Sequence, residues 1–213
     1  MNLLFARLAR VASAALLAVA APSNLLADVV MVSETKVGEV KSRSTMSISG
    51  SMVRSDNGTG TSVIMDTEAG VMTTLMHEQK MALKVDLAQL KAMAGATPAA
   101  AATVPLTTIT ATGKTLKIDG YTCELYLSEN SGTKVSMWIA KDYPGYAKLK
   151  AGLATMEKLN PSGVKQPEVP GLALRTEYTS NGLNFVTSVV SLKEQKVDTG
   201  LFRIPADYKA PGE

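Results

Sequence analysis

Hydrophobic and polar residues alternate along most of the chain after residue 28, which is the pattern of half-buried β-strands. Between Val29 and Met81, short alternating segments are separated by turn-forming sequences such as Asp56-Asn57-Gly58 and Glu68-Ala69-Gly70. Short strands joined by short turns predict antiparallel pairing. In residues 46–54, one parity is mostly apolar and the other carries Ser47, Ser49 and Ser51; the first parity consists of Met46, Ile48, Gly50, Met52 and Arg54.

The same alternation returns at about Thr107 and continues nearly to the C-terminus. Asp119-Gly120 and Asn181-Gly182 are two-residue hairpin signals between alternating segments. Two further apolar faces are formed by Tyr121, Cys123, Leu125 and Leu127, and by Val135, Met137 and Ile139. Together the segments predict nine to eleven strands.

Two segments have the spacing of helices. Asp86 and Gln89 have the spacing of a capping box before a helix over residues 87–94. A second helix is predicted over 145–159, where apolar residues recur every three or four positions at Tyr146, Leu149, Leu153, Met156 and Leu159. Residues 95–105 (GATPAAAATVP) are low in complexity and predict a flexible connection within one domain of residues 28–213.

The fold class follows from the order of these elements. The helices do not alternate with the strands, which disfavours a parallel α/β sheet. An antiparallel sheet of this length should twist and curl, and its apolar face then needs a cover. We therefore predict an α+β, mainly β fold: a strongly curved antiparallel sheet, or half-barrel, packed on one or two helices.

The N-terminal 27 residues have the features of a secretory signal peptide. Arg7 and Arg10 precede an apolar run from Val11 to Ala21, which is shorter than the 20 or so residues that span a bilayer. Cleavage after Ala20 or after Ala27 would fit. The expected mature protein is periplasmic or secreted and has no stable membrane anchor. Losing both arginines would lower the formal charge from +3 to +1, which argues against nucleic-acid binding.

The composition gives little support to catalysis or metal binding. One cysteine and one histidine exclude an intramolecular disulfide, a four-cysteine zinc site and any site with two imidazoles. Gly113-Lys114-Thr115 lacks the earlier glycine of a phosphate loop, because Thr108 occupies that position. His77 is expected in a solvated hairpin tip, and Cys123 as a buried apolar residue. Met72, Met76 and His77 offer soft copper ligands, but core or cavity lining explains the methionines better. We expect no enzyme activity, cofactor or metal.

One segment resembles a known family. The run from Gly113 to Glu124 (GKTLKIDGYTCE) is similar to a segment of the bacterial envelope family called domain of unknown function 4412. Met52-Val53-Arg54, Met137-Trp138-Ile139-Ala140 and Phe202 with Pro205-Ala206-Asp207-Tyr208 add to the resemblance. The resemblance implies an architecture like that of the periplasmic lipoprotein carriers (LolA/LolB-like), in which a curved sheet half-wraps helices around an apolar cavity.

Two functions remain open on this basis. The first is a non-enzymatic carrier or binding protein for a lipid or other hydrophobic molecule, whose cavity is lined by Met46, Ile48, Met52, Arg54, Val63, Met65, Leu125 and Met137. In this interpretation Arg54 meets a ligand head group at the rim. The alternative is a structural module of the cell envelope with a packed core, no small ligand and a protein partner.

Overall fold

The computed structural model describes residues 28–89, 92, 108–130, 133–158 and 168–211. Eleven strands form one antiparallel sheet in the order β6-β5-β4-β3-β2-β1-β11-β10-β9-β8-β7. The strands are β1 (Val29–Val37), β2 (Val40–Ser49), β3 (Met52–Asp56), β4 (Thr61–Asp66), β5 (Val71–Met76), β6 (Met81–Asp86), β7 (Ile109–Ile118), β8 (Tyr121–Asn130), β9 (Thr133–Ala140), β10 (Leu172–Ser180) and β11 (Leu183–Glu194). The helix α2 spans Tyr146–Lys158, and a 3-10 turn, η1, spans Thr199–Phe202.

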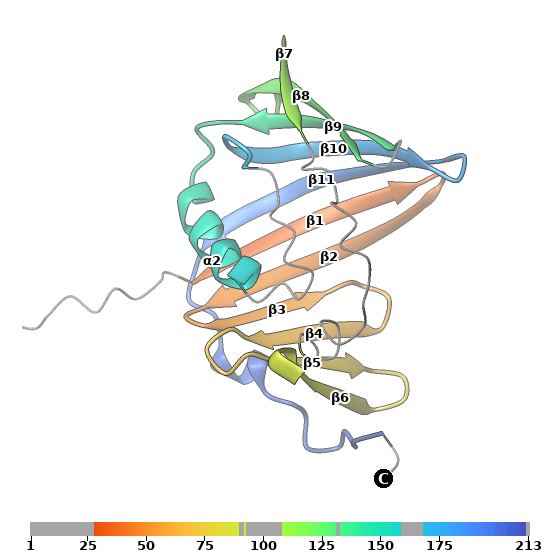
Figure 1. The fold of residues 1–213 in the computed structure, drawn as a ribbon, viewed down its shortest axis with the longest axis vertical. Helices are drawn as coiled ribbons and strands as arrows, with labels where there is room; N and C mark the ends of the chain where they lie inside the picture. Colours follow the sequence, from red (N-terminus) through yellow and green to blue (C-terminus); the bar gives the residue numbers. More distant parts are fainter. Residues whose placement is uncertain (1–27, 90–91, 93–107, 131–132, 159–167, 212–213) are drawn as a thin grey trace, which may run out of the picture.

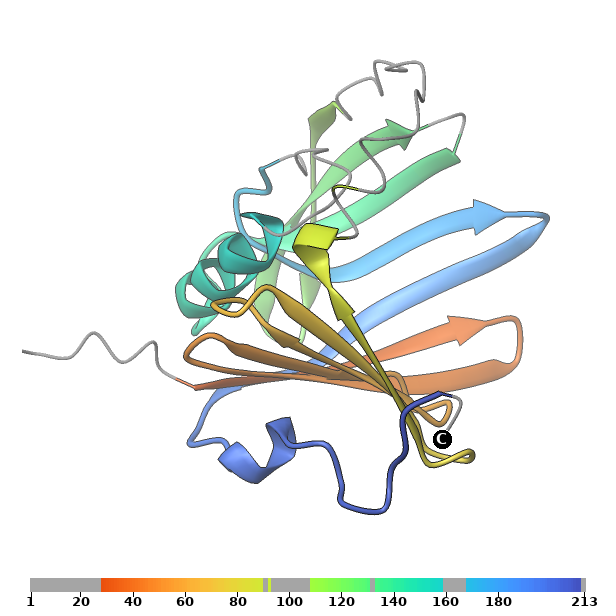
Figure 2. The same cartoon turned by 60° about the horizontal axis from the view of Figure 1, so that its bottom comes forward.

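The first and last strands meet at the centre of the sheet. β1 pairs with β2 on one side and with β11 on the other, so Val29 lies between Ile48 and Glu194. From this centre, hairpins run outward to β6 at one edge and to β7 at the other (Figure 1). The sheet curves strongly and stays open, and α2 lies inside the curve (Figure 2). The predicted fold class is thereby confirmed.

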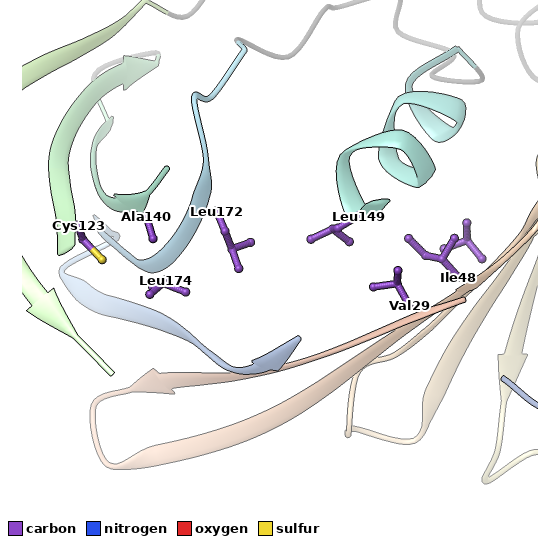
Figure 3. Close-up of a cluster of buried hydrophobic side chains, with 8 residues drawn as sticks. Val29, Ile48, Cys123, Ala140, Leu149, Leu172 and Leu174 are labelled. Carbon is purple, nitrogen blue, oxygen red and sulfur yellow. The ribbon is translucent and has the colours of Figure 1, made fainter. Parts of the chain in front are cut away.

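The two faces of the sheet can be assigned from the strand register and two packing clusters. Leu149 of α2 packs in one cluster with Val29 and Ile48, which defines the concave face (Figure 3). Met52, Ile64, Leu75 and Ala82 form a second cluster with Phe202 and Tyr208 on the opposite, convex face. Registers from β1 to β6 have no shifts, so every residue on these strands belongs to one face or the other.

The helix α2 sits directly on the centre of the concave face. Leu149 is only 1% exposed, and a Cβ atom on Gly152 would lie 2.8 and 2.9 Å from two carbons of the Ile48 side chain. Close approach therefore depends on glycine at this position. The helix follows the predicted range, but Leu153 remains 36% exposed, and Gly152 faces the sheet in its place.

The C-terminal segment, residues 197–209, lies on the convex face, opposite α2 (Figure 2). Its start is held by the backbone N–H of Val197, which donates to Asp28 Oδ2 at 2.7 Å. Its end extends the sheet edge, because Lys209 accepts from Ala82 N and donates to Lys80 O, each at 2.9 Å. This segment therefore covers a second apolar cluster that α2 cannot reach.

Most of the turn predictions are confirmed. Asp119 and Asn181 have φ of 50°, and the glycines after them are also at positive φ, as two-residue hairpins of this type require. Residues 87–89 and 92 are helical, and the rest of the predicted 87–94 helix lies outside the described residues. The predicted signal peptide (1–27) and the 95–105 connection also lie outside them.

Candidate functional site

A surface rich in methionine lies on the concave face of β4–β6. The register pairs Met65 with Met72 and Met76 with Met81 across neighbouring strands, so all four side chains share this face. Val63, Leu83 and Val85 complete it, and we call these seven residues the methionine surface. Six are half-buried and Leu83 is 42% exposed. The three strands together are about 10 Å wide at the usual strand spacing. A soft apolar surface of this size remains partly open to solvent.

Hydroxyl side chains continue the same face toward the other end of the central strands. Ser33 pairs with Ser44, and Thr35 pairs with Ser42 in β2 and Thr187 in β11. The hydroxyls of Thr35 and Thr187 are 2.9 Å apart. These five residues form the hydroxyl zone. Ser44 is two positions from Met46 on β2, so the zone begins about 7 Å from the apolar part of the face.

The eight predicted cavity residues do not share one face. Met46 and Ile48 pair with Met31 and Val29 on the concave face, and Val63 and Met65 lie on that face too. Met52 pairs with Ser49, and Arg54 with Ser47, so both lie on the convex face. The expected continuous parity from Met46 to Arg54 is not observed because the chain turns at Gly50–Ser51. A two-residue turn pairs its flanking residues, and this exchanges the faces on which the two parities lie.

The last two predicted residues lie on a different part of the sheet. Leu125 pairs with Trp138, whereas Met137 pairs with Tyr126, so Leu125 and Met137 lie on opposite faces of the β8–β9 pair. Trp138 packs against the cluster under α2 and pairs with Arg175 of β10, next to a register shift in that strand. Neither residue is on the strands that carry the methionine surface.

A polar cluster on the convex face was missed from the sequence. Arg54 donates from Nε and Nη2 to Asp56 at 2.9 and 2.7 Å, and from Nη1 to the Leu201 carbonyl at 2.7 Å. Ser62, only 1% exposed, donates to Asp56 and accepts from Arg54 Nη2 at 3.1 Å. Arg54 thus binds the C-terminal segment instead of reaching the cavity rim.

His77 belongs to this cluster, so the expected solvated turn histidine is not observed. Its Nε2 lies 2.6 Å from Ser62 Oγ, and its Nδ1 lies 2.6 Å from the Tyr208 hydroxyl. The hydroxyl hydrogen of Ser62 goes to Asp56, so Nε2 must donate to Ser62. A serine that gives its hydrogen to a carboxylate and receives one from histidine is not arranged as an activated nucleophile. The signal for this cluster is the shared parity of Arg54 and Asp56, but its partners come from distant segments.

The hydrogen bonds and charges in this cluster lower the pKa of one carboxyl group, that of Asp56. Burial acts to raise the pKa of Asp56, but hydrogen bonds from Arg54 and Ser62 and the positive charge of Arg54 outweigh it, so that the pKa lies below its usual value. Cys123 is fully buried as predicted, and burial raises the pKa of its thiol. Such a thiol is poorly suited to nucleophilic chemistry.

Among the described residues, no group of three or more histidine, cysteine, aspartate or glutamate side chains is arranged to hold a metal ion. Two hollows lie away from the methionine surface. One, of about 370 Å³, is polar and is lined by Lys134, Ser136, Glu177, Tyr178, Thr179 and Asn184. The other, of about 180 Å³, lies between the convex face and the C-terminal segment, and Met52, Ile64 and Phe202 are among its lining residues.

A family model, Domain of unknown function (DUF4412), matches residues 29–208. The chain belongs to the DUF4412 family. The matched range runs from the first strand to Tyr208 in the C-terminal segment, so the family's domain includes both faces described above. No curated protein matches the sequence. In the part of the chain that the structure describes, no helix is long and apolar enough to cross a membrane.

Several solved structures are loosely similar to this DUF4412 member. PNGF-II is 13% identical with a TM-score of 0.43; the match covers 86% of this chain but 31% of PNGF-II, so the chain spans about a third of that protein. MucB in complex with MucA(peri) is 7% identical with a TM-score of 0.42, covering 86% of this chain and 56% of MucB. A LolA superfamily protein from Nitrosomonas europaea is 11% identical with a TM-score of 0.31, covering 83% and 89% of the two chains.

Proposed function

We propose that the protein binds a lipid or another hydrophobic molecule on the concave face of its sheet and carries it without chemical change. The observation that supports this most directly is the methionine surface, which is mostly half-buried and surrounds a single threonine, Thr74, on β4–β6. Contiguous apolar surface that stays open to solvent is costly for a monomer and commonly marks a binding site. Methionine suits such a site because its flexible, polarisable side chain adapts to ligands of irregular shape.

We further propose that the protein works in the periplasm and that it catalyses no reaction. The N-terminal 27 residues have the basic start and short apolar run of a signal peptide, which supports export to the periplasm. The one serine–histidine pair in the described residues, Ser62 with His77, is oriented against nucleophilic attack. A binding or carrier role without catalysis therefore fits best.

The test is binding of Nile red, an uncharged dye whose fluorescence rises in apolar surroundings. We expect the purified protein to increase its emission and shift it to the blue. Met72→Gln, which puts an amide on the methionine surface, should weaken dye binding about fivefold to tenfold, since one buried apolar group is replaced by a polar one. Met72→Leu should retain binding.

The matched control is Val186→Gln, which changes a half-buried residue on the convex face. It should leave dye binding unchanged. Native mass spectrometry of protein from its own periplasm, followed by solvent extraction, should reveal a released lipid mass. If the dye does not bind, or if Met72→Gln and Val186→Gln behave alike, the concave face is not the binding site.

One observation favours the second candidate, a protein-interaction module. Among the described residues, β7 pairs with β8 alone, and most of its ten residues are exposed. The outer edge of β7 therefore presents backbone N–H and C=O groups that a partner strand could pair with. A clean apo mass together with failure to bind the dye would favour this function.

A further inference from the structure

Charged side chains are distributed very unequally between the two faces of the sheet. Strands β1–β6, β11 and residues 175–180 of β10 have registers that assign their residues to a face. On the convex face these strands carry Glu34, Lys36, Lys41, Arg43, Arg54, Asp56, Asp66, Lys84, Asp86, Arg175, Glu177 and Lys193.

The concave face of the same strands carries a single charged residue. Glu194 pairs with Val29 at the end of β11, and its carboxylate is bound by Lys148 of α2. That charge is therefore already neutralised by a partner from the helix. All other assigned concave positions are apolar residues or uncharged serine, threonine and tyrosine.

The concave face also has uncharged polar groups. Some are dispersed over several strands, namely Ser55, Thr61, Thr74, Thr176, Tyr178 and Ser180, and five others lie together. The hydroxyl zone (Ser33, Thr35, Ser42, Ser44 and Thr187) adjoins the apolar part of the face. Hydroxyls both donate and accept, so they can satisfy esters, ethers and other hydroxyls. They supply no counter-charge for a phosphate or carboxylate. The face therefore combines acyl-chain and hydroxyl chemistry without an ionic site.

We propose that the ligand is a neutral lipid, whose acyl chains lie on the methionine surface and whose uncharged ester or hydroxyl head group lies on the hydroxyl zone. This inference rests on the proposed function and specifies its ligand class. An anionic head group placed on this face would lose hydration without gaining an opposite charge, which is strongly unfavourable. A neutral head group exchanges water for hydroxyl partners at little cost.

The experiment compares two ligands that share their acyl chains and differ in the head group, which is a neutral hydroxyl in one and an anionic phosphate in the other. Dioleoylglycerol and dioleoyl phosphatidic acid have the same acyl chains, and each would be used to displace Nile red from the purified protein. We expect dioleoylglycerol to bind at least tenfold more tightly. Equal or tighter binding of the phosphatidic acid would overturn the neutral-lipid inference while leaving the proposed function intact. Failure of Nile red itself to bind would overturn both.

Two lysine substitutions test the placement of the head group. Ser44→Lys puts a cation in the hydroxyl zone and should strengthen phosphatidic acid binding at least fivefold without improving dioleoylglycerol binding. Ser188→Lys puts the same charge at a half-buried serine on the convex face, opposite Arg175, and should change neither affinity. Equal effects of the two substitutions would show that the head group does not bind at the hydroxyl zone. The comparison of the two lipids on the wild-type protein remains a valid test even if one of these variants fails to fold.

Discussion

Gly152 is the residue at which α2 comes closest to the sheet. Any larger side chain there meets Ile48, which is itself held against Val29 in the cluster beneath the helix. Glycine costs a helix interior about 1 kcal/mol relative to alanine. At this position, close packing of the helix on the sheet offsets that cost.

We expect Gly152→Val to lower the free energy of unfolding by about 2 kcal/mol, because overpacking against Ile48 outweighs the better helix propensity of valine. Urea unfolding followed by circular dichroism measures this change. Ala154→Val, at an exposed position of the same helix, should cost only about 0.5 kcal/mol. Equal losses in the two variants would contradict the close contact between α2 and β2.

The lowered pKa of Asp56 gives a pH dependence. Its carboxyl is more acidic in the folded state than its ordinary value of 3.8, so it contributes stability at pH values above 3.8. That contribution is lost as the pH falls through the folded-state value, because the unfolded chain takes up the proton first. Asp56→Asn should therefore be less stable at pH 6 and should show a shallower loss of stability below pH 4 than the wild type. Parallel pH profiles from urea unfolding would argue against this role.

At the scale of elements, the C-terminal segment acts as a cover for the convex cluster. Phe202 and Tyr208 pack on Ile64, Leu75 and Ala82, and Arg54 binds the Leu201 carbonyl. Apolar packing, and not the exposed ion pair between Lys80 and Asp207, should hold this segment in place.

We expect Phe202→Ala to lower the free energy of unfolding by about 2 kcal/mol, less than for a fully buried phenylalanine because the side chain is half-buried. Asp207→Ala should leave the urea midpoint unchanged. Proteolysis at the segment should also speed up in the Phe202 variant, since the cover opens more often. A larger effect from Asp207→Ala than from Phe202→Ala would contradict this ranking.

Elements with strong local signals were predictable from the sequence, and faces were less so. Alternation and hairpin residues such as Asn181-Gly182 are local, so strand number and antiparallel pairing could be derived. The turn at Gly50–Ser51 lies inside one continuous alternating run, where a single glycine among hydroxyl residues is a weak signal. Without this turn, the pattern predicts Met52 and Arg54 on the same face as Met46, whereas the structure places them on the opposite face. The cluster of Ser62, His77 and Tyr208 depends on long-range packing that no local pattern records.

At the scale of the whole molecule, the sheet separates two kinds of surface. Over β1–β6, β11 and residues 175–180, the concave face is apolar and hydroxylated except for Glu194, whereas the convex face carries the other charges and the C-terminal segment. An open, curved sheet allows this because each strand contributes alternate residues to the two faces. Because of the same alternation, a substitution at Ser44 changes only the concave face, and the equivalent substitution at Ser188 changes only the convex face and serves as its control.

The central pairing of β1 with β11 also has a consequence for how the chain is made. Val29 finds its neighbour Glu194 only after almost the entire polypeptide is available. A chain that emerges N-terminus first can form the hairpins from β1 to β6 early, but the middle of its sheet must wait for the last strand. Until then the apolar concave residues of β1 lack one neighbour. Folding should therefore be slow, and the emerging chain should stay incompletely packed until β11 has been made.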